Sequence, residues 1–409
     1  MTAADYSVSL VDTAAEIPAQ LWAECFPPPL EGKWWYEILE RSALEDQFTF
    51  FYAVLHVDGN PSGIAPAFLM DVPIELVVPP VILPAFRFAG KIIPSILFER
   101  TLFIGSPCSD EGTVGLLPGV DRERAFAGFQ QAFQELARDL KAPMLVWKDF
   151  PGSYADDFKI LTAKNGLFRL VSFPGAVAEF HSKSKDDYYK NMKASRRQKM
   201  KRKLRRSAEL ADLDAEIVQR PGDSTLQEMF ALFGQTYEKA ATKFERLPLA
   251  FFQRAAALDI SHFVVLREKA TGNMAAFMLC FDVGGVLINK FIGIDYSKPK
   301  EWVLYFRLWD AVVDWALSRE FSAIQSGQTG YSAKIEIGHR LVPLTNYCRH
   351  RNPVVQAIYK AVAKTVDWHT LDPDLASYLK VHPELKAPPS TGKEPEGAAS
   401  NISYPKAAA

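Results

Sequence analysis

Tyr331 and Lys334 are the two residues whose types and spacing most favour chemistry. They lie three positions apart, so on a helical turn they share one face, just beyond a strand predicted at 321–325. Polar groups placed there in α/β proteins commonly contact ligands. A tyrosine hydroxyl can donate a proton or hydrogen-bond a tetrahedral intermediate, and a lysine can bind a phosphate or carboxylate. The alternative is that Tyr331 packs in the core and Lys334 is a solvated charge.

Lys290 is a charge inside an otherwise apolar run, 286–292. Buried lysine is rare unless it is paired, so Lys290 either faces a groove that holds a substrate carbonyl or points to solvent at a sheet edge. Gln328 and Arg340 belong to the neighbourhood of Tyr331 and are predicted to contact substrate.

Lys148 and Asp149 end the matching strand of the first half of the chain. They are predicted either to pair with each other or to contact substrate. The seven histidines and four cysteines show neither metal-ligand spacing nor a disulfide framework, so the sequence predicts no metal site and a reducing compartment.

A basic run from Lys183 to Arg206 contains 12 Lys or Arg and only two Asp. A thin apolar stripe (Tyr188, Met192, Met200 and Leu204) predicts a helix that packs by one face. Its cationic face could contact RNA phosphates, an acidic carrier protein or an anionic membrane, or it could simply be solvated. The predicted basic patch consists of Lys193, Arg196, Arg197, Lys201 and Arg205.

Length and composition indicate a globular protein of two domains. The chain has 409 residues, of which 48% are hydrophobic and 23% charged. A net charge of −1 excludes a global attraction to nucleic acid, so any such contact must be local. The apolar stretch 73–97 carries five prolines together with Arg87 and Lys91, which argues against a membrane-spanning helix. No secretory signal is recognisable at the amino terminus, so we expect a cytoplasmic protein.

The same series of elements is predicted twice along the chain. Two helices precede a β-hairpin with a Gly-Asn turn, and a strand ending in Phe-Ile-Gly, a helix and a buried strand follow. The ranges are 18–25, 34–43, 48–72, 103–105, 126–140 and 144–147 in the first copy, and 225–242, 248–258, 262–283, 291–293, 305–315 and 321–325 in the second.

This element order resembles the Gcn5-related N-acetyltransferase (GNAT) fold, and two copies resemble its double-domain branch, which contains FemAB-type and BioF2-like transferases. The closest local match is the Tyr331-x-x-Lys334 stretch that continues through Gly338 to Pro343. The resemblance implies an α/β fold with two tandem acetyltransferase-like mixed sheets flanked by helices. The expected division is 1–175 for the first copy, 176–215 for the basic segment, 216–386 for the second copy and 387–409 for a disordered tail.

The resemblance also implies an acyltransferase that moves an acyl group from an activated ester or thioester to a small-molecule amine. Acyl-coenzyme A is one donor to consider, although the usual glycine loop is missing at 295–302 and irregular at 105–115. The other donors are a carrier-protein thioester and, as in FemAB-type enzymes, an aminoacyl-tRNA. A non-catalytic binding module on the same fold is a further alternative. Neither the catalytic copy nor the oligomeric state follows from the sequence.

Overall fold

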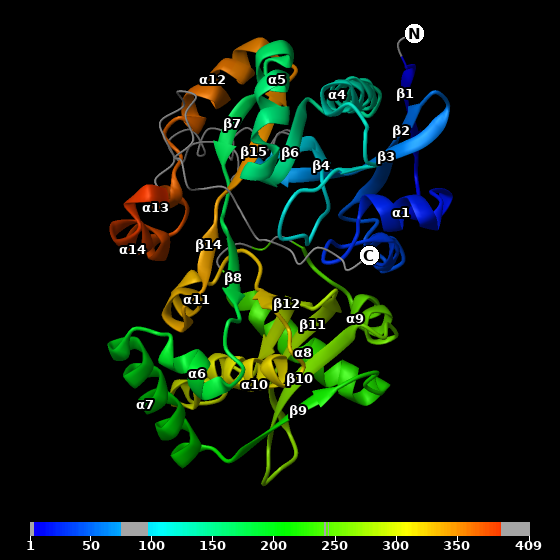
Figure 1. Ribbon diagram of the computed structural model, residues 1–409. Coiled ribbons are helices and arrows are strands. Elements are labelled where there is room, and N and C mark those ends of the chain that lie inside the picture. Colours follow the sequence, from blue (N-terminus) through cyan, green and yellow to red (C-terminus); the bar gives the residue numbers. More distant parts are fainter. Residues whose placement is uncertain (1–3, 75–96, 241–242, 244, 386–409) are drawn as a thin grey trace.

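The computed structural model describes residues 4–74, 97–240, 243 and 245–385, and contains two mixed β-sheets, one above the other in Figure 1. The first sheet has the order β1-β2-β3-β4-β6-β15-β7, with β5 beside β3. Its strands are β1 (Tyr6–Val11), β2 (Thr49–Val57), β3 (Asn60–Pro73), β4 (Phe98–Ile104), β5 (Gly115–Leu116), β6 (Met144–Pro151), β7 (Phe168–Val171) and β15 (Leu344–His350).

The second sheet has the order β14-β8-β13-β12-β11-β10-β9. Its strands are β8 (Gly175–Glu179), β9 (Leu213–Val218), β10 (Ser261–Glu268), β11 (Met274–Val283), β12 (Val286–Ile294), β13 (Ala323–Gln325) and β14 (Arg340–Val342). Most pairs in both sheets are antiparallel, but β4–β6 and β12–β13 are parallel.

Helices cover both faces of each sheet. The helices are α1 (Ala19–Cys25), α2 (Lys33–Glu40), α4 (Arg122–Asp139), α5 (Ala155–Asn165), α6 (Lys185–Lys190), α7 (Ala194–Leu210), α8 (Asp223–Lys239), α9 (Leu249–Ala256), α10 (Leu304–Ser318), α11 (Tyr331–Ile337), α12 (Pro353–Ala363), α13 (Trp368–Leu371) and α14 (Pro373–Val381).

The predicted repeat is confirmed element by element. The paired helices are α1–α2 and α8–α9, the hairpins are β2–β3 and β10–β11, and the Phe-Ile-Gly strands are β4 and β12. The helices that follow are α4 and α10, and they lead to β6 and β13. The amphipathic pattern explains the packing of α4, because Phe126, Phe129 and Phe133 form one buried stripe against the first sheet.

The two copies exchange strands. β8 follows the first copy in sequence but pairs with β13 and β14 in the second sheet. β15 follows the second copy but pairs with β6 and β7 in the first sheet. The boundary expected at residue 175 coincides with the first residue of β8, and that division takes no account of the exchange.

A shared core also joins the copies. Trp35 and Leu39 of α2 are fully buried in one cluster with Phe251 and Phe252 of α9 and Phe277 of β11. On the other face of the second sheet, α10 packs with α6 and α7. Burial of this much apolar surface between the copies favours a single folding unit.

The basic run forms α6 and α7. Met200 is buried, and Met192 and Leu204 pack against the core with α10, which confirms the predicted apolar stripe. The single predicted helix is wrong, because α6 ends at Lys190 and α7 begins at Ala194. No helix among the described residues has the length and apolar character needed to span the bilayer. The tail predicted at 387–409 and most of the apolar stretch 73–97 lie outside the described residues.

Candidate active site between the two copies

The parallel strands β12 and β13 pair over only three residues and then separate. Val286 to Ile288 pair with Ala323 to Gln325, whereas β12 continues to Ile294. The last pair, Ile288 and Gln325, lines a cleft between the copies. Beyond this point β13 no longer pairs with β12, and at its far end the Ile294 N–H donates to the Thr236 hydroxyl at 3.1 Å instead.

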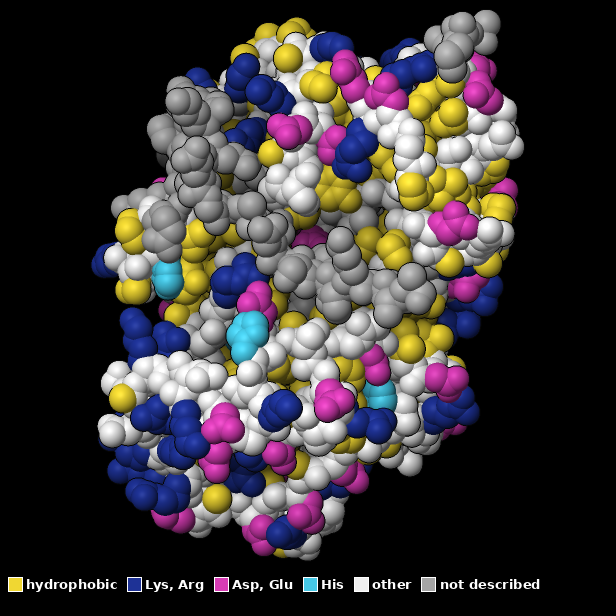
Figure 2. Space-filling view, in the orientation of Figure 1, with side chains coloured by type: hydrophobic (Ala, Val, Ile, Leu, Met, Phe, Trp, Pro, Cys, Tyr) yellow, Lys and Arg dark blue, Asp and Glu magenta, His cyan; other side chains and the backbone are white. Residues whose placement is uncertain are grey.

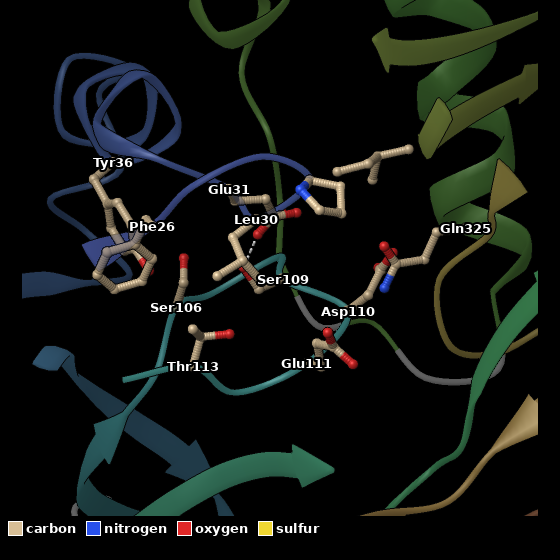
Figure 3. Close-up of a pocket in the computed structure, with 12 residues that line it drawn as sticks. Phe26, Leu30, Glu31, Tyr36, Ser106, Ser109, Asp110, Glu111, Thr113 and Gln325 are labelled. Atoms are coloured by element: carbon tan, nitrogen blue, oxygen red, sulfur yellow. Dashed lines mark hydrogen bonds between the residues drawn. The ribbon is translucent and has the colours of Figure 1, made fainter. Parts of the chain in front are cut away.

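The first copy supplies the remaining walls of the cleft. Figure 3 shows side chains converging on it from the loop around Glu31 and from the loop that carries Ser109 and Asp110. The cavity holds about 30 Å³, which is room for roughly two water molecules. Its polar lining consists of carboxylates, hydroxyls and one amide, which belong to Glu31, Asp110, Glu111, Tyr36, Ser106, Ser109, Thr113 and Gln325.

A β-bulge places Lys290 at this cleft. Leu279 pairs with Phe291 and Cys280 pairs with Asn289, so Lys290 is the extra residue of β12. A bulge bends a strand and re-aims the side chain it carries. The Lys290 side chain is only 1% exposed, so the solvent-facing alternative does not describe it.

The Lys290 ammonium binds groups of the first copy. It forms an ion pair with Glu31 and lies 3.6 Å from the Asp110 carboxylate. It donates a hydrogen bond to the Cys108 carbonyl at 2.9 Å and lies 4.9 Å from the centre of the Trp35 ring. Two carboxylates, a carbonyl and an aromatic face together form a cage for one ammonium group.

Burial and charge shift the proton affinities inside this cage. Burial raises the pKa of Glu31, and the nearby Asp110 adds to that rise, while Lys290 opposes it. Burial acts to lower the pKa of Lys290, but Asp110 and Glu31 outweigh it, so the pKa of Lys290 is raised. Lys290 therefore stays charged, and Glu31 is a better proton acceptor than an ordinary glutamate. The Ser109 hydroxyl donates a hydrogen bond to Glu31.

Lys334 is connected to the cleft through a backbone turn. Its ammonium donates to the carbonyls of Gly327 and Gln328 at 3.0 and 3.4 Å. The Gly327 N–H donates to Asp110 at 3.3 Å, so Gly327 links Lys334 to the carboxylate that also lies near Lys290. Burial lowers the pKa of Lys334 to about 8.

Tyr331 and Gln328 hold the segment before β8. The fully buried Tyr331 hydroxyl donates to the Pro174 carbonyl at 2.8 Å. The Gln328 amide donates to the Phe173 carbonyl at 2.9 Å. Among the hydrogen bonds of the described residues, these contacts are structural, and a direct role of either side chain in catalysis stays a prediction.

Lys148 and Asp149 pair with each other. The ammonium of Lys148 contacts the Asp149 carboxylate, which also accepts from the Ser172 hydroxyl. Asp149 has a positive φ of 60°, and its N–H donates to the Asn346 side chain at 2.7 Å where the register between β6 and β15 shifts. The site therefore secures the exchanged strand β15, and contact of this pair with substrate stays a prediction.

Arg340 and the basic patch lie apart from the cleft cluster. Arg340 pairs with Glu179 at 2.6 Å on the surface. Figure 2 shows Lys and Arg side chains gathered over α6 and α7. Within the patch, Lys201 lies 3.9 Å from Asp186 and Arg205 lies 3.8 Å from Glu209. Of the other patch residues, Lys193 is exposed and Arg196 and Arg197 are partly exposed.

The helix after the first Phe-Ile-Gly strand, α4, does not fit the pyrophosphate of coenzyme A. The Asp121 carboxylate caps α4 by accepting from the Arg124 N–H at 3.1 Å, so an anion already fills that position. In the loop before α10, Asp295 accepts from the N–H and hydroxyl of Ser297 at 2.9 and 2.6 Å, whereas no side chain among the described residues caps the N-terminus of α10 itself. The identity of the acyl donor therefore stays a prediction.

Sequence reasoning missed Glu31 and Asp110, the two carboxylates at the centre of the cleft. Glu31 follows a run of three prolines, and Asp110 lies in the glycine-bearing loop at 105–115. Carboxylates in such loops are a general signal of function. However, no motif links two loops so far apart in the chain, so their meeting depends on the tertiary structure.

No protein-family model and no curated protein sequence matches this chain. Solved structures with a similar fold include FemX, at 11% identity and a TM-score of 0.53, with 86% of this chain and all (100%) of that chain covered. A tandem GNAT protein from the clavulanic acid biosynthesis pathway is 12% identical, with coverage of 85% and 99% and a TM-score of 0.49. A GCN5-related N-acetyltransferase from Sphaerobacter thermophilus is 9% identical, with coverage of 85% and 96% and a TM-score of 0.43. The likeness to FemX shows the fold that the sequence predicted: two acetyltransferase-like mixed sheets in tandem, flanked by helices.

Proposed function

We propose that this protein is an acyltransferase that forms an amide by moving an acyl group from an activated ester or thioester to an amine. One observation carries the proposal: the last paired residues of the separating strands, Ile288 and Gln325, line an acidic cleft between the copies. Separated strands offer backbone donors to a carbonyl, and carboxylates offer a place for an amine and its proton.

The reaction needs one proton acceptor and one site for the developing oxyanion. The amine nitrogen attacks the acyl carbon, a C–N bond forms, and the C–S or C–O bond of the donor breaks. Glu31, whose pKa is raised, takes the proton of the amine and passes it to the leaving group. Backbone N–H groups of β12 beyond Ile288 stabilise the oxyanion.

Lys334, Tyr331 and Gln328 position the site in this scheme. Lys334 holds the turn whose Gly327 N–H contacts Asp110, and Tyr331 and Gln328 fix that turn to the segment before β8. These residues hold the backbone next to the cleft in place.

A macromolecular donor is favoured by the cationic face of α6 and α7. An aminoacyl-tRNA, as in a FemAB-type aminoacyltransferase, or a thioester on an acidic carrier protein would be attracted to it. Both donors are intracellular, and a cytoplasmic location is part of the proposal. Acyl-coenzyme A is the small-molecule alternative.

The test is a search for the amide product by mass spectrometry. Purified protein is incubated with primary amines and with each donor type in turn: acetyl- and long-chain acyl-coenzyme A, acyl carrier protein and aminoacyl-tRNA. A new amide that depends on the protein is expected with one donor class. Donor binding without any amide would instead favour a non-catalytic binding module.

A further inference from the structure

The cage around the Lys290 ammonium is built like a receptor for a free amine. Its four components come from three segments of the first copy, whereas the ammonium comes from the second. Glu31 and Asp110 are 14% and 10% exposed at the side chain, so the cage is almost closed to water. An ammonium makes the same three N–H contacts whether it belongs to a lysine or to a ligand.

Stability alone does not explain such a cage. Buried ion pairs lose much hydration free energy, and apolar residues of similar volume often serve a core equally well. Apolar side chains already join the copies next to the cage, since Trp35 packs against Phe251 and Phe281. The buried charges are therefore better explained by a ligand.

The cage and the cavity beside it are rich in carboxylates. Glu31 and Asp110 share the one ammonium of Lys290, and the lining of the cavity adds the carboxylate of Glu111. The cavity beside them is small in this state, at about 30 Å³, so a larger ligand must displace something. The flexible four-carbon stem of Lys290 is the part that can move.

We infer that the Glu31–Asp110 cage is the binding site for the primary ammonium group of the acceptor, and that Lys290 occupies it only until the acceptor displaces it. The inference rests on the proposed function, because it assigns the acceptor subsite of that reaction. It selects primary amines without a carboxylate near the amino group, since such a carboxylate would meet Asp110 and Glu111 in the same small cavity. Alkylamines and diamines fit this class, and free α-amino acids do not.

The experiment removes the Lys290 ammonium by substitution and then offers the cage a free ammonium in solution. The full-length Lys290→Ala variant is melted with and without ethylammonium chloride at tens of millimolar. Binding to the folded state alone raises the melting temperature, and we expect a rise of roughly 2–4 °C. Lys298→Ala is the matched control, because that lysine is also partly buried and ion-paired but lies outside the cage, and it should not respond.

Three further comparisons decide the specificity. Lys290→Met fills the cage with an apolar side chain and should show no response to ethylammonium. Tetramethylammonium, a cation without N–H donors, should not stabilise Lys290→Ala. Adding Glu31→Gln and Asp110→Asn to Lys290→Ala should abolish the response. Stabilisation by tetramethylammonium, or an equal rise in Lys290→Met, would overturn the inference.

Failure of Lys290→Ala to fold would still give an answer. Refolding is then attempted in ethylammonium chloride and in sodium chloride of equal ionic strength, with circular dichroism as the readout. Recovery in ethylammonium alone supports the cage, and no difference contradicts it. Because no acyl donor is present, this result is independent of whether amide formation is ever found.

Discussion

Lys334 is a buried cation bonded to carbonyl oxygens, and this makes its contribution to stability depend on pH. Burial lowers its pKa from the ordinary 10.5 to about 8, so the unfolded chain binds the proton more tightly than the folded one. The free energy of unfolding is highest above pH 10.5, decreases as the pH falls from 10.5 to 8, and has lost this contribution once the pH is below 8. The loss below pH 8 amounts to about 3 kcal/mol, because each pKa unit corresponds to about 1.4 kcal/mol.

We therefore expect the free-energy difference between wild type and Lys334→Met to depend on pH. The wild type should gain about 2 kcal/mol relative to the variant between pH 7 and pH 10. Urea unfolding of both proteins at the two pH values measures the change. A difference that is the same at both would mean that Lys334 keeps its ordinary pKa.

The sequence predicts a chemical role for Tyr331, and replacing this residue distinguishes a catalytic role from a structural one. Its hydroxyl is bonded to the Pro174 carbonyl and is fully buried. We expect Tyr331→Phe to lower the free energy of unfolding by about 1 kcal/mol and to keep amide formation within about threefold. Denaturant unfolding and initial rates provide the two values. A rate loss of 100-fold with little change in stability would instead establish Tyr331 as catalytic.

At the scale of elements, the loop between β4 and α4 determines whether the cleft exists. Gly112 lies against β6 so closely that an added Cβ would lie 2.2 Å from the Lys148 carbonyl oxygen. We expect Gly112→Ala to lower the free energy of unfolding by roughly 2–4 kcal/mol, because the backbone must shift to make room for the Cβ. The same shift should displace Asp110. Gly222→Ala is the control, since a Cβ there meets nothing within 4 Å. Equal unfolding free energies of the two variants would show that the loop adapts freely.

The α6–α7 surface predicts a salt-dependent interaction. Lys193 and Lys201 are exposed on it, so Lys193→Glu with Lys201→Glu should leave folding unchanged. At low salt, binding of an aminoacyl-tRNA or an acidic carrier protein should weaken about tenfold or more. Lys360→Glu with Lys364→Glu, both exposed at α12, is the charge-matched control. Equal titration curves for the three proteins would show that the patch is only solvated.

Most elements could be predicted from the sequence because periodicity reports burial locally. The stripe of Phe126, Phe129 and Phe133 predicts α4, and the Gly-Asn turns predict both hairpins. The bulge at Lys290 could not be predicted, because the sequence of a strand does not show whether a charged residue pairs with the neighbouring strand or is the extra residue of a bulge. The contact of that lysine with Glu31 depends on how two whole copies pack.

For the whole molecule, the exchange of β8 and β15 couples the two copies. Neither sheet is complete without a strand from the other half of the chain. We expect urea unfolding to give one transition, with fluorescence and far-UV circular dichroism superimposable. The fragments 1–180 and 181–409 should fold only when mixed. Two separate transitions, or a folded isolated fragment, would contradict this coupling.

The exchange also explains why the site was only partly predictable. The sequence repeat shows that two similar units exist, but it does not state which strands they trade. The cleft forms where the copies meet, so its carboxylates come from one copy and its separated strands from the other. Lys290, a charge inside an apolar strand, and Lys334, just beyond a strand end, could be proposed from one copy alone, whereas Glu31 and Asp110 required the assembled pair.

The central claim is that acyl transfer takes place in this cleft, and the rate of amide formation in cleft variants tests it most directly. With the donor that gives product, initial rates are compared for wild type, Glu31→Gln, Asp110→Asn and the exposed control Glu24→Gln, all confirmed as folded. Glu31→Gln should lose about 100-fold or more in rate, as expected for loss of a proton acceptor. Asp110→Asn should also lose rate, because the ammonium cage loses one of its carboxylates, while Glu24→Gln keeps wild-type activity. Wild-type rates in Glu31→Gln and Asp110→Asn would place the reaction elsewhere in the molecule and contradict the account.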